Sequence, residues 1–174
     1  VKVTKASCVT SAKIKVKWYG TSGSNGYIIY RKVDGTWQEV GRTDSKARAF
    51  TDDGLELGKT YTYTVRGFRN EGNKEYLSGY DTTGVSAKTV PSKVTISSLK
   101  MSGRKIKITW KGVSGTTKYK VYRKLKGESS YKAIATVSSK TKSYTDSKVS
   151  YGKTYVYKIR AVAKLNGETL YGLN

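Results

Sequence analysis

Hydrophobic and polar residues alternate strictly at two places in this chain. Residues 13–18 read Lys-Ile-Lys-Val-Lys-Trp, and residues 105–110 read Lys-Ile-Lys-Ile-Thr-Trp. A period of two puts the apolar side chains on one face of a strand and most of the polar ones on the other. We therefore predict that both ranges are half-buried antiparallel strands, each ending in a tryptophan, Trp18 or Trp110, that faces the core.

The pattern occurs twice along the chain. Gly-Lys-Thr-Tyr stands at 58–61 and again at 152–155, 94 residues later, and the two strands described above are 92 residues apart. A drift of two residues is expected where a loop has accepted an insertion. A repeat of this length is about the size of one small domain. The sequence therefore predicts two homologous domains in tandem, at 1–90 and 91–174.

Alternating or β-branched runs between turn signals predict an all-β fold with β-sandwich domains. We expect strands at 3–6, 13–18, 27–32, 37–42, 49–51, 60–68 and 83–90 in the first domain, and at 105–110, 119–124, 131–137, 143–145 and 154–163 in the second. No run in the second domain corresponds to 83–90. This domain is therefore expected to lack its final strand, which a segment beyond Asn174 or a partner would supply.

Turn residues set the connections between these strands. Asp34-Gly35 and Asn166-Gly167 predict tight hairpins, because both residues of such a turn need positive φ. The segment after Gly72 is predicted to be a long loop. The dipeptides Thr51-Asp52 and Thr145-Asp146 are predicted to be turns in which the aspartate accepts backbone hydrogen bonds.

Several of these residues resemble the fibronectin type III family. Trp18 and Trp110 stand where that family carries its second-strand tryptophan, and residues 55–61 and 149–155 are similar to its Leu-x-Pro-Gly-x-x-Tyr corner, although both lack the proline. The resemblance implies immunoglobulin-like sandwiches in which Tyr61 and Tyr155 are corner tyrosines bonded to backbone upstream. The repeated Tyr-Arg-Lys and Gly-Lys-Thr-Tyr strings look like repeats in surface proteins of Gram-positive gut bacteria of the Firmicutes type.

Composition excludes several kinds of chemistry. The 174 residues include no histidine and one cysteine, Cys8, so Ser-His-Asp and Cys-His catalysis, a disulfide and the common zinc sites are excluded. The few acids of the second domain fall in predicted turns. We therefore predict no enzyme activity, no catalytic residue, no metal site and no cofactor.

Charge distinguishes the two halves. The chain has 34 Lys and Arg against 12 Asp and Glu, a net charge of +22; residues 92–174 hold 19 of the basic and 3 of the acidic residues. Lys105 and Lys107 are expected on one sheet of the second domain, and Lys120 and Lys158 on the other. Lysines spread over both faces favour one of two roles: keeping the domain surface solvated, or attracting an anionic polymer without specificity. They do not favour specific nucleic-acid recognition, which usually concentrates charge on one face.

Tyrosines are the other candidate ligand-binding residues. Tyr76 and Tyr80 are expected in the long loop, where they could stack on a sugar or a protein partner, although a match of Tyr171 with Tyr76 in the repeat favours packing. Tyr30 and Arg66 have outward parity on neighbouring strands, so we expect a cation–π contact between them, and likewise between Tyr122 and Arg160.

These observations predict non-catalytic spacer or interaction modules of a larger bacterial surface or secreted protein, extracellular or attached to the cell wall. The expected partners are flanking domains, with an anionic cell-wall polymer, a glycan or a host protein as further candidates, and no membrane span. One alternative is an adhesive module that binds an anionic polymer or glycan through the basic second domain or the loop tyrosines. Another is a set of accessory domains of a carbohydrate-active enzyme.

Overall fold

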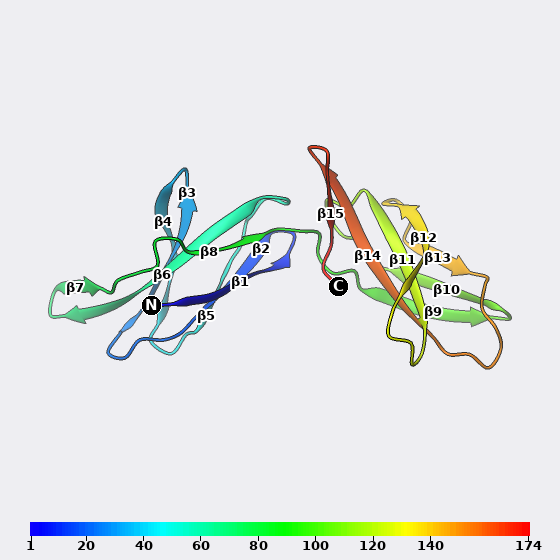
Figure 1. Ribbon diagram of the computed structural model, residues 1–174, viewed down its shortest axis with the longest axis horizontal. Helices are drawn as coiled ribbons and strands as arrows, with labels where there is room; N and C mark the ends of the chain where they lie inside the picture. The colour runs from blue at the N-terminus through cyan, green and yellow to red at the C-terminus, as the bar shows by residue number, and fades with distance from the viewer. The chain divides into compact units, whose positions relative to one another are not determined.

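The computed structural model describes residues 1–174, and all of its regular structure is β-strand, as Figure 1 shows. The chain divides into two compact units, Val1–Thr89 (unit 1) and Val90–Asn174 (unit 2), one residue from the expected boundary. No helix is long and apolar enough to cross a membrane.

Unit 1 contains eight strands in two sheets. They are β1 (Val3–Thr10), β2 (Lys13–Trp18), β3 (Gly26–Val33), β4 (Thr36–Asp44), β5 (Ala49–Asp52), β6 (Thr60–Glu71), β7 (Lys74–Leu77) and β8 (Val85–Lys88). The small sheet has the order β1-β2-β5, and the large sheet has the order β4-β3-β6-β7, with β8 also paired to β6. Along the outer edge of β6, β8 covers Thr60–Tyr63 and β7 covers Phe68–Glu71.

Unit 2 repeats this topology with seven strands. They are β9 (Ile96–Ser102), β10 (Lys105–Trp110), β11 (Lys118–Leu125), β12 (Lys132–Ser138), β13 (Ser143–Asp146), β14 (Tyr155–Leu165) and β15 (Glu168–Tyr171). Its sheets have the orders β13-β10-β9 and β12-β11-β14-β15. On the outer edge of β14, β15 covers only Val162–Leu165. On this outer edge no strand of unit 2 pairs with Tyr155–Ile159.

The two hairpin predictions are confirmed. Asp34 has a φ of 48° and Gly35 a φ of 82° between β3 and β4, and Asn166 and Gly167 have φ values of 48° and 81° between β14 and β15. Positive φ at both central residues matches the right-handed twist of the flanking strands, which is why Asp, Asn and Gly occur there.

The segment after Gly72 is not a continuous loop, so that prediction was wrong. Lys74–Leu77 forms β7, which pairs with the end of β6 through Phe68 opposite Leu77. All four residues of β7 are exposed, so the strand lacks the apolar alternation that would have revealed it. In unit 2 the corresponding pair is Val162 and Tyr171, so Tyr171 matches Leu77 and not Tyr76.

A core built from both sheets fills each unit. Trp18 and Trp110 are each 2 % exposed and lie beside Tyr27 and Tyr119, with ring centroids 5.6 Å apart in both pairs. The apolar residues of the alternating strands complete the cores, among them Ile14 and Val16 in unit 1 and Ile108 in unit 2. The apolar positions of the alternating sequence therefore face the core, and the polar positions between them face solvent.

Candidate functional site

A buried polar cluster lies at one end of the unit 1 core. Asp52, 6 % exposed, accepts hydrogen bonds of 2.8 Å on one carboxylate oxygen from the Arg31 guanidinium and from the Tyr63 hydroxyl. Arg31 also lies over the Tyr61 ring, 5.6 Å from its centroid. Burial and the bond to Asp52 raise the pKa of Tyr63, so the phenol stays protonated and remains a donor.

Unit 2 contains the same cluster. Asp146, 2 % exposed, accepts from Arg123 and the Tyr157 hydroxyl, both at 2.8 Å, and its other oxygen accepts from the Lys148 N–H at 3.0 Å. Burial by itself would raise the pKa of Asp146, but the bonds from Arg123, Lys148 and Tyr157 outweigh it and hold the pKa below its ordinary value. The carboxylate therefore stays charged, and it holds the strand end to the opposite sheet.

The sequence interpretation of these aspartates was incomplete. Asp146 does accept a turn-type backbone bond, but Asp52 and Asp146 end strands β5 and β13 and are buried by an arginine and a tyrosine of the other sheet. The repeat of Tyr-Arg-Lys together with Thr-Asp was the available signal. The repeat alone does not show that the arginine of the first string bonds to the aspartate of the second across the core.

The corner tyrosines have the geometry that the family resemblance implied. The Tyr61 hydroxyl accepts a hydrogen bond of 3.0 Å from the Glu56 N–H, five residues upstream. The Tyr155 hydroxyl accepts one of 3.1 Å from the Ser150 N–H. Each bond ties the crossing between sheets to the strand that follows it.

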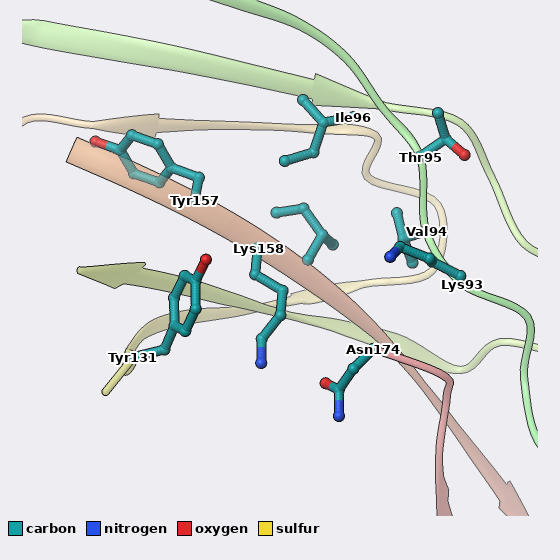
Figure 2. Close-up of a pocket in the computed structure, with 9 residues that line it drawn as sticks. Lys93, Val94, Thr95, Ile96, Tyr131, Tyr157, Lys158 and Asn174 are labelled. Atoms are coloured by element: carbon teal, nitrogen blue, oxygen red, sulfur yellow. The ribbon is translucent and has the colours of Figure 1, made fainter. Parts of the chain in front are cut away.

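The first candidate interaction site is a groove on the open edge of β14. Its volume is about 400 Å³, and it lies between β14 and the segment that leads into β9. Figure 2 shows Val94, Ile96 and Tyr157 around it, with Lys158 beside the Tyr131 ring. The groove is therefore apolar inside and has a cation at its rim.

The equivalent place in unit 1 is covered. There β8 pairs with β6 through Val85 opposite Tyr63, and Val85 and Ala87 pack on the core. Tyr63 and Val65 are consequently fully buried, whereas their unit 2 counterparts Tyr157 and Ile159 are 8 % and 4 % exposed. The groove is thus the space that β8 occupies in the first unit.

The second candidate site is the outer face of the unit 2 sheet β12-β11-β14-β15, where cations lie over tyrosine rings. The Lys158 ammonium is 5.3 Å from the Tyr122 centroid and 4.7 Å from that of Tyr131, and Lys120 lies 5.3 Å from the centroid of Tyr171. Of the predicted lysines, the structure places Lys120 and Lys158 together on this sheet. Lys105 and Lys107 lie on β10 in the other sheet, exposed to solvent.

The expected pairing of tyrosine with arginine is different in the structure. Arg66 lies 5.0 Å from the centroid of Tyr80, and Arg160 lies 5.1 Å from the centroid of Tyr171. Their side-chain Nε–H groups donate to the carbonyls of Ser78 and Gly172, which draws each guanidinium toward the segment after β7 or β15. Tyr30 and Tyr122 are therefore not the partners of these arginines.

The third candidate site is a cleft in unit 1. Tyr80 meets Trp37 edge to face, with ring centroids 6.5 Å apart, beside a hollow of about 200 Å³. Tyr76 is 52 % exposed on β7 and lines a different hollow. The structure therefore does not bring Tyr76 and Tyr80 together, and it adds Trp37, which the sequence did not single out as a binding residue.

Comparisons with known proteins agree with this architecture. Residues 94–172 match the family model described as fibronectin type III domain, SaeA third domain. Over 170 residues the chain is 28 % identical to exoglucanase B of Cellulomonas fimi, an alignment that covers 90 % of this chain and 14 % of that protein. The chain therefore spans only a small part of the length of this relative.

Two solved structures of fibronectin type III domains align with nearly the whole chain. A two-domain fibronectin type III segment from chicken tenascin is 16 % identical with a TM-score of 0.44, covering 98 % of this chain and 95 % of that one. The FN1–FN3 domains of chicken CNTN1 are 16 % identical with a TM-score of 0.42, covering 99 % and 62 %.

The family resemblance rests on the model match in unit 2 and on the repeat that links unit 2 to unit 1. Residues 94–172, most of unit 2, match the fibronectin type III model. Unit 1 repeats the strand order of unit 2, its core tryptophan and its corner tyrosine. Both units therefore have the fibronectin type III-like sandwich architecture.

Proposed function

We propose that residues 1–174 are non-catalytic modules of a longer extracellular bacterial protein, and that the open edge of β14 is where the next segment of that protein docks. The observation that carries this proposal is the groove beside β14, at the place that β8 fills in unit 1. An incoming strand would bond to the free edge of Tyr155–Ile159 and bury Tyr157 and Ile159, since Ala161 already accepts a hydrogen bond from the Gly172 N–H. Such docking would join unit 2 to the next segment of the protein through a shared sheet.

The repeated polar clusters support a scaffold role. In both units an arginine, an aspartate and a tyrosine bond to one another at the end of the core, and this arrangement fixes strands. The similarity to part of exoglucanase B favours, as a variant of the same role, modules that accompany a carbohydrate-active domain. In either setting the pair would serve as a spacer outside the cell.

The test extends the chain beyond Asn174. One version carries about ten further residues of the native protein, and the control carries a Gly/Ser segment of equal length. We expect the native extension alone to raise the unfolding temperature of unit 2, by about 4–8 °C for each 1 kcal/mol gained in a domain of this size. Equal unfolding temperatures in the two versions would overturn the docking proposal.

A second candidate function rests on the charge of unit 2. Its 3 carboxylates cannot balance its 19 basic side chains, and the cation-bearing sheet face described above is open to solvent. An anionic polymer such as a cell-wall polyphosphate would bind by releasing its counterions. We expect its affinity to fall steeply between about 50 and 300 mM salt.

Charge-reversal variants provide the control for this candidate. Lys120 lies on β11 and Lys164 is exposed on β14 in unit 2, whereas Lys15 and Lys17 are exposed on β2 in unit 1. Lys120→Glu combined with Lys164→Glu should weaken binding more than Lys15→Glu combined with Lys17→Glu. Equal effects of the two pairs, or binding indifferent to salt, would contradict an electrostatic site on unit 2.

A further inference from the structure

The unit 1 cleft has the composition of a binding site. Its walls are Tyr30, Trp37, Thr64, Arg66 and Tyr80, around a hollow of about 200 Å³. The Trp37 and Tyr80 rings stand nearly perpendicular, at 87°. The hollow is smaller than the roughly 300–1,000 Å³ typical of pockets for drug-sized ligands. It suits a single ring.

The loop that carries Tyr80 is held at several points. The Thr64 hydroxyl donates to the Asp81 carbonyl at 2.8 Å, and the Arg66 Nε–H donates to the Ser78 carbonyl at 2.8 Å. The Asp81 carboxylate in turn accepts from the Thr83 and Gly84 N–H groups at 2.9 and 3.2 Å. The cleft is therefore formed before a ligand arrives, which lowers the entropy cost of binding.

Trp37 is fixed as well. Gly84 has a φ of 70°, and a Cβ at this position would lie 2.8 Å from the Trp37 ring, so the glycine allows the indole to pack against the loop backbone. The Lys32 ammonium lies 5.5 Å from the Trp37 centroid. The indole is thus held in place by its surroundings, and its Nε1–H makes no hydrogen bond within the chain.

The polar groups at the cleft are mainly donors without carboxylate partners. The two terminal nitrogens of Arg66 and the Tyr30 hydroxyl make no hydrogen bond within the chain, and Arg66 is in no ion pair. The nearby acids Glu39 and Glu75 are both bound by Arg42, at 2.9 and 2.6 Å. An unpaired guanidinium beside two aromatic walls favours a ligand that combines an apolar ring face with a negative charge.

We propose that this cleft binds one acidic sugar unit of a polysaccharide, a hexuronate, with its ring against Trp37 and Tyr80 and its carboxylate on Arg66. This function goes beyond the spacer role, which needs no ligand.

Unit 2 shows what closes such a cleft. At the position of Thr64 it has Lys158, since Thr64 pairs with Tyr30 and Lys158 pairs with Tyr122. The Lys158 ammonium lies over both Tyr122 and Tyr131, the counterparts of Tyr30 and Trp37. A lysine of β14 therefore lies between these two tyrosines in unit 2, whereas unit 1 has no lysine at this position and its hollow lies between Trp37 and Tyr80.

The test is NMR titration of the whole chain with trigalacturonate. The protein has three indole N–H groups, and Trp18 and Trp110 are buried, so only the Trp37 signal should shift and saturate. Tyr80→Ala should weaken this binding by about tenfold, a factor equal to about 1.4 kcal/mol. The matched control Tyr76→Ala, which removes an exposed tyrosine outside the cleft, should leave it unchanged.

Two further arms keep the proposal falsifiable. Thr64→Lys, which copies the unit 2 arrangement, should abolish the Trp37 shift while leaving the Trp18 and Trp110 signals of a folded chain. Because it also removes the hydroxyl bond to Asp81, its control is Thr64→Val, which removes that bond without adding a cation and should keep the Trp37 shift. Neutral trigalactose should bind at least about tenfold more weakly than trigalacturonate, because it cannot pair with Arg66. The proposal is overturned if Trp37 is unmoved by trigalacturonate, if Tyr76→Ala weakens binding as much as Tyr80→Ala, or if trigalactose binds equally well.

Discussion

The ammonium of Lys158 lies 4.7 Å from the centre of the Tyr131 ring, on the outer face of β14. The same ammonium is 5.3 Å from the centre of the Tyr122 ring, so one cation makes cation–π contacts with two tyrosines. At the equivalent position in unit 1 stands Thr64, which is buried and donates to the Asp81 carbonyl instead.

The contact predicts a measurable contribution to stability. Lys158→Gln should lower the free energy of unfolding of unit 2 by about 1 kcal/mol, since an exposed cation–π contact contributes roughly 0.5–1 kcal/mol and two rings are involved. Lys105→Gln is the control, because Lys105 is exposed and lies over no ring. Denaturant unfolding measures both, and an equal effect of the two substitutions would contradict the role of the rings.

Trp110 should be the most costly single truncation in unit 2. Its indole is 2 % exposed and packs on Tyr119, so Trp110→Ala should cost roughly 3–5 kcal/mol. A loss of this size is enough to unfold a domain as small as unit 2. Trp37→Ala should cost less than about 1 kcal/mol, because Trp37 lies at the surface of its sheet and outside the unit 1 core cluster. Circular dichroism of the two variants compares them, and similar losses would show that the assigned core is wrong.

The low pKa of Asp146 predicts a pH dependence with a definite sign. A carboxyl group whose folded-state pKa lies below its ordinary value of about 3.9 stabilises the fold above that value, and this stabilisation is lost as the pH falls through the folded-state pKa. We therefore expect unit 2 to lose stability in acid below about pH 4.

Asp146→Asn provides the control for this prediction. The variant is less stable at neutral pH, but its stability should change less with pH, because only two other carboxylates, Glu128 and Glu168, remain in the unit. The Trp110 indole signal follows unfolding of unit 2 in both proteins. An unchanged acid slope in Asp146→Asn would show that the loss in acid does not arise at Asp146.

Much of the fold could be predicted from the sequence, because its signals are local. Alternation at 13–18 and 105–110 marks which side chains are buried, and Asp34-Gly35 and Asn166-Gly167 encode their turns directly. Strand β7 could not be found in this way. It is exposed along its whole length and forms by pairing with β6 rather than by burying a face.

The candidate sites were harder to predict, because they depend on residues that meet only after folding. Tyr80 was identified as a binding candidate, but its neighbour Trp37 comes from a strand 43 positions earlier. The Arg31–Asp52 pair likewise joins two sheets. Periodicity says which face a residue takes and not which residue it will meet across the sheet.

The open edge of β14 is the central claim of this account, and amide hydrogen exchange tests it most directly. In the 174-residue chain, the amides of Tyr155–Ile159 that point away from β11 should exchange rapidly, while those of Thr60–Tyr63 that point toward β8 exchange slowly. With about ten further native residues after Asn174, the Tyr155–Ile159 amides should become as slow as those of unit 1. Slow exchange along Tyr155–Ile159 in the dilute 174-residue monomer would contradict the account.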